Sequence, residues 1–194
     1  ELEKTKSSLL AIIANERGAK DACEFEEIKY LGYPFSISET FQQRNTNASI
    51  EESLTRVELI QNLCLKNKKE LVIYLSMGFG NPYGDKFHED ILAKWIDRLG
   101  QLDIKIFAPS DTIGVSEPEI IKRIYSTLIP EFPNYEIGAH LHTTSDKWEE
   151  KVNAAFLSGC SRFDGAMGGL GGCPMAEDTL TGNMPTENLI QYFV

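Results

Sequence analysis

Residues 103–142 read DIKIFAPSDTIGVSEPEIIKRIYSTLIPEFPNYEIGAHLH, and this stretch decides the fold class. The apolar runs at its two ends, 103–110 and 135–142, are short and continuous, which is typical of buried parallel strands. Between them, residues 116–129 form a helical pattern that opens with Ser116 as the expected cap. A strand, a helix and a second strand in this spacing predict one β–α–β unit of a parallel sheet.

The same unit repeats along the chain. Further strand-like runs occupy 9–14, 28–36, 70–77 and 161–169, and further helical patterns occupy 49–66, 88–99 and 145–158. The helix expected at 49–66 opens with Ser49 and Glu52, the spacing of a capping box, and the helix at 145–158 is expected to begin at Ser145 or Asp146. Six strands that alternate with helices indicate one domain, residues 1–194, in which helices cover a parallel sheet.

Two closures suit this order of elements: an open doubly wound sheet or a closed barrel. An open sheet usually carries a GxGxxG loop after its first strand, and ANERGAKDA (14–22) lacks that pattern. The dense glycine cluster follows the last strand instead, where barrels often hold substrate phosphates. Because the barrel needs eight strands and six are found, we expect an incomplete (β/α)8 TIM barrel with about strands 3 to 8 present.

Composition excludes several classes of protein. The chain is 42% apolar and 25% charged, and its net charge of -10 argues against binding to nucleic acid or to an anionic membrane. No run reaches the roughly 18 apolar residues of a membrane span, and the opening ELEKTKSSLLAIIANERG lacks a secretory signal pattern. The four cysteines form no CxxC pair, so we expect a reducing compartment and a soluble cytoplasmic protein.

Polar side chains gather where the expected strands end, which is where barrel enzymes place their reactive groups. The triplet His140-Leu141-His142 is the most informative, because strand residues two apart point to the same side. Two imidazoles on one face make half of a metal site for Mg²⁺ or Mn²⁺, with Zn²⁺ as a further candidate. The alternative is a pair of structural or surface histidines.

Three more residues carry candidate roles, each with a structural alternative. Asn183 could ligate a metal through its amide oxygen, or it could be a turn residue after Gly182. Asp111 could accept a proton or orient a metal-bound water, or it could cap the next helical turn. Cys173 lies among glycines in a loop, where a thiol beside a cation can act as acid or base. We expect the other cysteines to pack as small apolar residues and His88 to be a surface residue.

These motifs resemble a known family. SDTIG (110–114), HLH (140–142), GLGGCP (169–174) and GN (182–183), with SETFQQRNTNASIEESLTR (38–56), are similar to the 3-hydroxy-3-methylglutaryl-CoA lyases, which belong to a wider group of metal-dependent barrel lyases and condensing enzymes. The resemblance runs from about residue 9 to about residue 190.

The resemblance implies that the protein cleaves 3-hydroxy-3-methylglutaryl-CoA (HMG-CoA) to acetoacetate and acetyl-CoA. It implies that His140, His142 and Asn183 ligate Mg²⁺ or Mn²⁺, that Cys173 is catalytic, and that Asp111 contributes to proton transfer. The expected partner is an acyl-CoA substrate, with no nucleic acid and no membrane. The exposed edges of an incomplete barrel also make a homodimer a candidate assembly.

Three features depart from the family pattern. The Arg-Asp motif at the end of the family's first strand has no counterpart in the chain. The loop CPMAEDTLTGN (173–183) is one residue longer than the usual CPxAxGASGN, and Thr143 stands where an aspartate is usual. Two alternatives therefore stay open. One is a related carbon–carbon lyase, aldolase or condensing synthase, such as an isopropylmalate or homocitrate synthase, although Cys173 argues against the synthases. The other is a catalytically incomplete barrel fragment.

Overall fold

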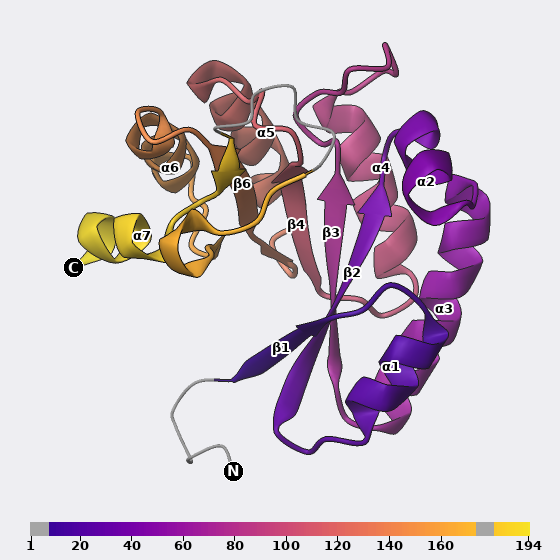
Figure 1. Ribbon diagram of the computed structural model, residues 1–194. Helices are drawn as coiled ribbons and strands as arrows, with labels where there is room; N and C mark the ends of the chain where they lie inside the picture. The colour runs from indigo at the N-terminus through magenta and orange to yellow at the C-terminus, as the bar shows by residue number, and fades with distance from the viewer. Residues whose placement is uncertain (1–7, 174–180) are drawn as a thin grey trace.

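The computed structural model describes residues 8–173 and 181–194. A curved parallel sheet forms its centre, with neighbouring strands in the order β1-β2-β3-β4-β6-β7 (Figure 1). These strands are β1 (Leu9–Ile12), β2 (Ile28–Ser36), β3 (Glu70–Ser76), β4 (Ile106–Asp111), β6 (Ala139–Thr143) and β7 (Phe163–Asp164). The short β5 (Glu136–Ile137) pairs with β4, and β8 (Gly182–Asn183) pairs antiparallel with β6. Spatial order follows chain order, as in a barrel and unlike a doubly wound sheet.

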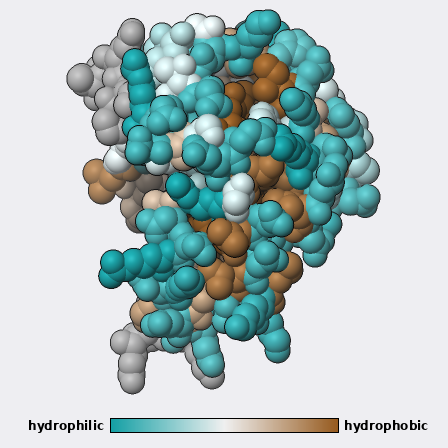
Figure 2. All heavy atoms as spheres, turned by 90° about the vertical axis from the view of Figure 1, so that its right-hand side faces the viewer, coloured by the Kyte–Doolittle hydropathy of each residue, from teal (hydrophilic) through white to brown (hydrophobic). Residues whose placement is uncertain are grey.

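The helices lie around the outside of the curved sheet (Figure 1). They are α1 (Glu16–Cys23), α2 (Glu39–Thr46), α3 (Ile50–Lys66), α4 (Glu89–Gly100), α5 (Pro118–Glu131), α6 (Trp148–Leu157) and α7 (Thr186–Phe193), with a 3-10 turn, η1, at Met167–Gly169. The side that carries α2 and α3 is mostly hydrophilic, with apolar side chains visible between the polar ones (Figure 2). In the part of the chain that the structure describes, no helix is long and apolar enough to cross a membrane.

Side-chain alternation along the strands separates the packing core from the interior of the barrel. Leu71, Ile73 and Phe107 face outward and join the large buried cluster between the sheet and the helices. The residues beside them, Val72 and Tyr74 among them, face inward and form a separate small cluster with Ile106, Ala108, Leu10 and Tyr30. The residues that point outward therefore stabilise the fold, and the alternate residues that point inward line the interior of the barrel.

Most of the expected elements are present, and the differences have local causes. The capping box of Ser49 and Glu52 is present at the start of α3. The expected cap at Ser116 is wrong: Glu117 is the N-cap of α5, because the Ser116 hydroxyl donates to Asp111 instead. The start expected at Ser145 or Asp146 is also wrong. Lys147 is the N-cap of α6, and the Asp146 carboxylate accepts from the Thr144 hydroxyl.

Other differences concern elements that are shorter or were not expected. The strand expected at 161–169 is reduced to Phe163–Asp164, because Gly168 and Gly169 adopt positive φ angles of 62° and 65°. Helices α1, α2 and α7 were not predicted. The first two have side-chain caps that were overlooked, Asn15 accepting from the Gly18 amide and Ser38 accepting from the Phe41 amide.

Gln42 connects three of these elements. Its side chain is buried, and its amide oxygen accepts from the Ser36 amide at the end of β2 at 2.8 Å. Its amide nitrogen donates to the Thr46 hydroxyl at 2.6 Å and to the Ser53 hydroxyl of α3 at 2.7 Å. A buried amide that pairs with two buried groups and one half-buried hydroxyl fixes how α2 and α3 sit on the carboxyl end of β2.

We therefore expect Gln42→Ala to lower the free energy of unfolding by about 2–3 kcal/mol, since it leaves buried polar groups without partners. The matched control is Gln43→Ala on the exposed side of the same helix, which should stay within about 0.5 kcal/mol of the wild type. Urea denaturation followed by circular dichroism measures both. Equal effects of the two substitutions would contradict the role given to Gln42.

Candidate metal site

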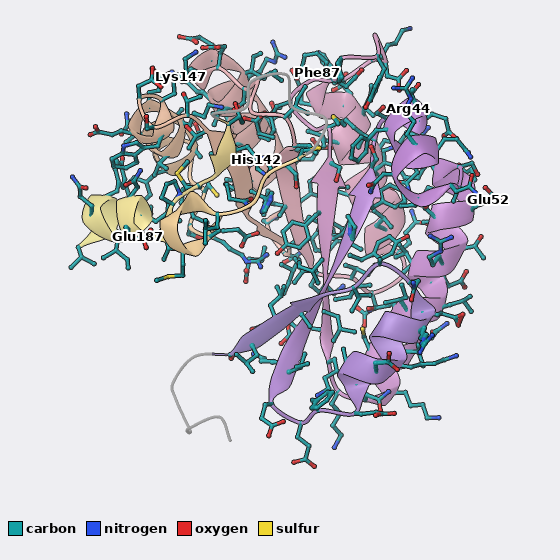
Figure 3. The ribbon with its side chains drawn as sticks, viewed as in Figure 1. Arg44, Glu52, Phe87, His142, Lys147 and Glu187 are labelled. Atoms are coloured by element: carbon teal, nitrogen blue, oxygen red, sulfur yellow. The ribbon has the colours of Figure 1, made fainter. Side chains whose placement is uncertain are left out.

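The two histidines of β6 point into the barrel interior. Their outward neighbours Ala139 and Leu141 belong to the large core cluster, so His140 and His142 lie on the opposite face. Their ring centroids are 5.4 Å apart, and His142 appears at the upper end of β6 in Figure 3. The shared face that the sequence predicted is therefore present.

The environment of the histidines suits metal ligation. Burial, helped by the nearby His140, lowers the pKa of His142 to about 4, so this ring is neutral near pH 7. Neutral imidazole is the form that binds a metal. The Nδ1 atom of His142 is buried and has no hydrogen-bond partner among the described residues, whereas the buried Nδ1 of His140 has the Asp164 carboxylate beside it at 3.5 Å. Buried polar atoms normally have a partner, so a cation bound by the His142 ring would fit the site.

Asn183 lies beside His142. The antiparallel pairing of β8 with β6 sets the two residues opposite each other. The amide nitrogen of Asn183 donates to the Leu170 carbonyl at 2.8 Å, so its amide oxygen is the atom that could ligate a metal. No group of three or more His, Cys, Asp and Glu side chains that could hold a metal occurs among the described residues. The arrangement thus offers two nitrogens and one amide oxygen, a partial ligand set for a divalent cation.

Two residues that the sequence analysis missed support His140. The Asp164 carboxylate of β7 lies 3.5 Å from His140 Nδ1, and the Tyr74 ring meets the His140 ring edge-on at 5.1 Å. Burial raises the pKa of Asp164, but the adjacent His140 and the Arg162 charge outweigh this effect and hold it below its usual value. The carboxylate is therefore charged and available to orient the imidazole. The pairing of β6 with β7 that brings Asp164 beside His140 could not be read from the sequence.

Small cavities surround the pair on the inner face. One, of about 460 Å³, is lined by His140, Asp164 and Asn183 together with Tyr74. A second, of about 190 Å³, is lined by both histidines and by Ser76 and Ser110. The candidate ligands therefore border space that a substrate could enter from the barrel interior.

Asp111 occupies a different setting from the one expected. Its side chain has no exposed surface, and both carboxylate oxygens accept hydrogen bonds. Oδ1 accepts from the Ser116 amide, and Oδ2 accepts from the Ser116 hydroxyl and from Lys151. The sequence left open a proton acceptor and a cap of the next helical turn, and the structure places this carboxylate in a buried ion pair with Lys151 that also accepts from Ser116.

Cys173 does not line either of the cavities that the histidines border. It is half-buried and packs against Phe41, Met77 and Ile113, at the carboxyl ends of β2, β3 and β4. Asp178, which also belongs to this glycine-rich loop, lies outside the described residues. Cys64 and Cys160 are buried as expected, and Cys23 is half-buried. His88 is half-exposed, but it is also the N-cap of α4 and accepts from the Asp90 amide.

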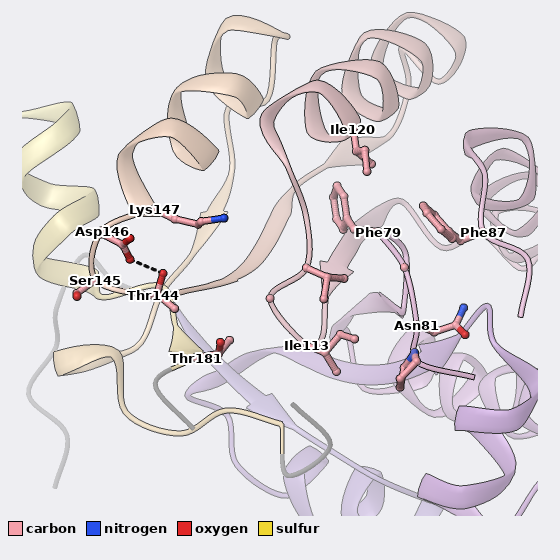
Figure 4. Close-up of a pocket in the computed structure, with 14 residues that line it drawn as sticks. Phe79, Asn81, Phe87, Ile113, Ile120, Thr144, Ser145, Asp146, Lys147 and Thr181 are labelled. Atoms are coloured by element: carbon pink, nitrogen blue, oxygen red, sulfur yellow. Dashed lines mark hydrogen bonds between the residues drawn. The ribbon is translucent and has the colours of Figure 1, made fainter. Parts of the chain in front are cut away.

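Two larger cavities lie outside this centre. One, of about 1060 Å³, opens between the loops that follow β3, β4 and β6, with Phe79 and Ile120 on one side and Lys147 on the other (Figure 4). The other, of about 650 Å³, lies at the start of α1 and is lined by Arg17 and Arg56 together with Glu16 and Glu52. Neither cavity is lined by the histidines.

The chain is similar in sequence and structure to known proteins. A family model described as HMGL-like matches residues 1–193. Hydroxymethylglutaryl-CoA lyase YngG of Bacillus subtilis is 32% identical over 180 residues, which are 93% of this chain and 60% of that protein. The crystal structure of the Bacillus subtilis HMG-CoA lyase superposes with a TM-score of 0.89 at 30% identity, covering 98% of this chain and 63% of that one.

A further structure, the HMG-CoA lyase of Acinetobacter baumannii in complex with coenzyme A and 3-methylmalate, is 28% identical with a TM-score of 0.87. It covers 97% of this chain and 61% of its own length. The likeness confirms the expected fold, a parallel α/β half-barrel close to the lyase barrels, and the chain spans about 60% of the length of YngG. Matched over residues 1–193 by the family model and at 32% identity by YngG, the chain belongs to the HMGL-like family.

Proposed function

We propose that the chain carries the metal-binding part of a carbon–carbon lyase that cleaves HMG-CoA to acetoacetate and acetyl-CoA. The observation that carries the proposal is the convergence of His140, His142 and Asn183 on the inner face, through the pairing of β6 with β8. Lyases of this name are about 30% identical to the chain. Because the chain covers about 60% of YngG, the full activity is proposed for the whole protein.

His140, His142 and Asn183 are proposed to hold Mg²⁺ or Mn²⁺. When bound, such a cation polarises the hydroxyl and carboxylate oxygens of a substrate and stabilises the negative charge that develops on them. The protein supplies a neutral imidazole for this purpose at His142, because burial lowers the pKa of this ring to about 4. Asp164 keeps the His140 ring in one orientation.

Cys173 is proposed to deliver the proton that the acetyl-CoA enolate needs once the carbon–carbon bond has broken. Gly171 and Gly172 before it have φ angles of 85° and 155°, so the thiol follows a stretch of backbone that favours glycine. The thiol lies at the same carboxyl end of the sheet as His142, but it is held by β2–β4 contacts instead of β6. A substrate that reached both groups would extend across the mouth of the barrel.

The cavity with Arg17 and Arg56 suits the phosphates of an acyl-CoA. Arg17 and Arg56 line this space with the polar Asn15 and Asn45, and Glu16 and Glu52 line it as well, so the two arginines would offer phosphate contacts beside two carboxylates. The carboxyl end of β1 leads from the barrel interior to this cavity, because Ile12 borders the space at the histidines and Ala14 borders the cavity. We propose that the nucleotide end of the substrate binds here.

A related carbon–carbon enzyme acting on another acyl-CoA or 2-oxo acid remains the second candidate function. The half-buried Cys173 beside Ile113 favours a lyase over a condensing synthase, since the resemblance gives the synthases no such cysteine loop. The enzyme produced from its complete reading frame, with Mg²⁺ or Mn²⁺, should release acetoacetate from HMG-CoA, and an enzyme-coupled acetoacetate assay follows this. A folded, metal-loaded enzyme that leaves HMG-CoA intact would move the proposal to another acyl substrate.

The roles of the metal ligands and the thiol can be separated. His140→Ala and His142→Ala should abolish tight Mn²⁺ binding, because each removes one of the few ligands. Cys173→Ser should leave Mn²⁺ affinity within about twofold and lower turnover by about 100-fold or more, the scale of a lost proton-transfer group. Titration calorimetry with Mn²⁺ and the acetoacetate assay measure the two properties. An equal loss of metal affinity in all three variants would contradict the assignment.

The cavity lined by Arg17 and Arg56 leads to a further prediction for the same enzyme. The double variant Arg17→Gln/Arg56→Gln should raise KM for HMG-CoA by about tenfold or more with little change in kcat, because it removes two charge-assisted contacts to phosphate. The matched control Lys66→Gln/Lys122→Gln makes the same change in net charge at exposed positions outside the cavity. A similar KM in the two double variants would show that the cavity does not bind the nucleotide.

A further inference from the structure

We propose that Lys151 is a positioning residue for the metal site, and that with Asp111 it fixes the carboxyl end of β6, and hence His142, against the loop that follows β4. The inference rests on the proposed metal-binding role of His140 and His142. It assigns a task to a buried lysine that the sequence analysis did not single out, and it gives Asp111 a positioning task in place of proton transfer.

The Lys151 ammonium uses all three of its hydrogen-bond donors. The side chain extends from α6 into the protein and is 1% exposed. Its Nζ donates to Asp111 Oδ2 at 2.8 Å, to the His142 carbonyl at 2.9 Å and to the Gly114 carbonyl at 3.0 Å. An ammonium has three N–H donors, so all three are used, and each reaches a different segment of chain.

Both oxygens of the Asp111 carboxylate also accept hydrogen bonds. Asp111 ends β4, and both of its oxygens also accept hydrogen bonds from Ser116 at the start of the next helix. A buried pair of charges is stable only when its remaining hydrogen-bonding capacity is satisfied, and that condition is met here. The pair therefore acts as a rigid link between the end of β4, the loop at Gly114, α6 and the end of β6.

His142 is the point at which this link meets the metal site. Its carbonyl accepts from Lys151, its backbone pairs with Asn183 of β8, and its ring faces the barrel interior. A shift of this one backbone position would move two candidate ligands together, and metal sites tolerate displacements of only about 0.5 Å. The hydroxyl of the neighbouring Thr143 donates to the Thr144 carbonyl, so it does not hold the His142 backbone in place.

The test compares Mn²⁺ affinity in variants of the whole protein, measured by titration calorimetry and by the electron paramagnetic resonance spectrum of bound Mn²⁺. Lys151→Met should weaken Mn²⁺ binding by about 10- to 100-fold, the effect typical of lost support around metal ligands. Lys151→Met/Asp111→Leu removes both buried charges, so it should fold even where the single variant does not, and it should bind Mn²⁺ as weakly. Gln42→Ala provides the matched control, since it should destabilise the protein without changing Mn²⁺ affinity.

The outcomes separate this inference from the proposed function. Wild-type Mn²⁺ affinity in the folded double variant would overturn the positioning role, and so would an equal loss of affinity in Gln42→Ala. A wild-type protein that does not bind Mn²⁺ would instead contradict the proposed metal site, and the inference would fall with it. A loss confined to the Lys151 variants, with an altered spectrum for the Mn²⁺ that still binds, is the expected result.

Discussion

The alternation of side chains along parallel strands is the constraint on which the rest of the structure depends. Successive residues of a strand point to opposite faces, so one register decides both the packing and the site. In β6, Ala139 and Leu141 are fixed by the helices outside, and this commits His140 and His142 to the interior. A shift of one residue would bury the two imidazoles under α6 and expose Leu141, so the hydrophobic core itself selects the orientation of the candidate ligands.

The features that could be predicted from the sequence are those with a local signature. Strand β3 appears as a continuous apolar run, α3 opens with a capping box, and the HxH triplet needs only the two-residue period. The features that could not be predicted depend on contacts between distant segments. Lys151 and Asp111 are separated by 40 positions, and nothing near either residue marks the other as its partner. The predicted start of α5 was wrong for a local reason, because the Ser116 hydroxyl donates to Asp111, five residues earlier, instead of capping the helix.

Charge is arranged differently on the two sides of His142. On the inner side, burial keeps the imidazole neutral, and the nearby carboxylate of Asp164 is held charged. On the outer side, Lys151 and Asp111 form a compensated pair that presents no net charge to the interior. A lone buried ammonium at this position would oppose the binding of a cation by the adjacent histidines, so the Asp111 carboxylate is needed electrostatically as well as geometrically.

Cys173 and the strand that carries the histidines pack against different apolar clusters of the same architecture. The histidines are fixed by a strand and by a buried ion pair, so their positions vary little, which suits ligands that must hold a cation in a set geometry. The thiol follows two glycines with positive φ angles and rests on a small apolar cluster, so its position depends on a few weak contacts. A group that must move a proton only at one stage of a reaction gains from such adjustability, whereas a metal ligand would lose affinity. The described contacts therefore hold the histidines on a strand and the thiol on a small apolar cluster, and the longer segment of this chain joins Cys173 to Asn183, so its length bears on both.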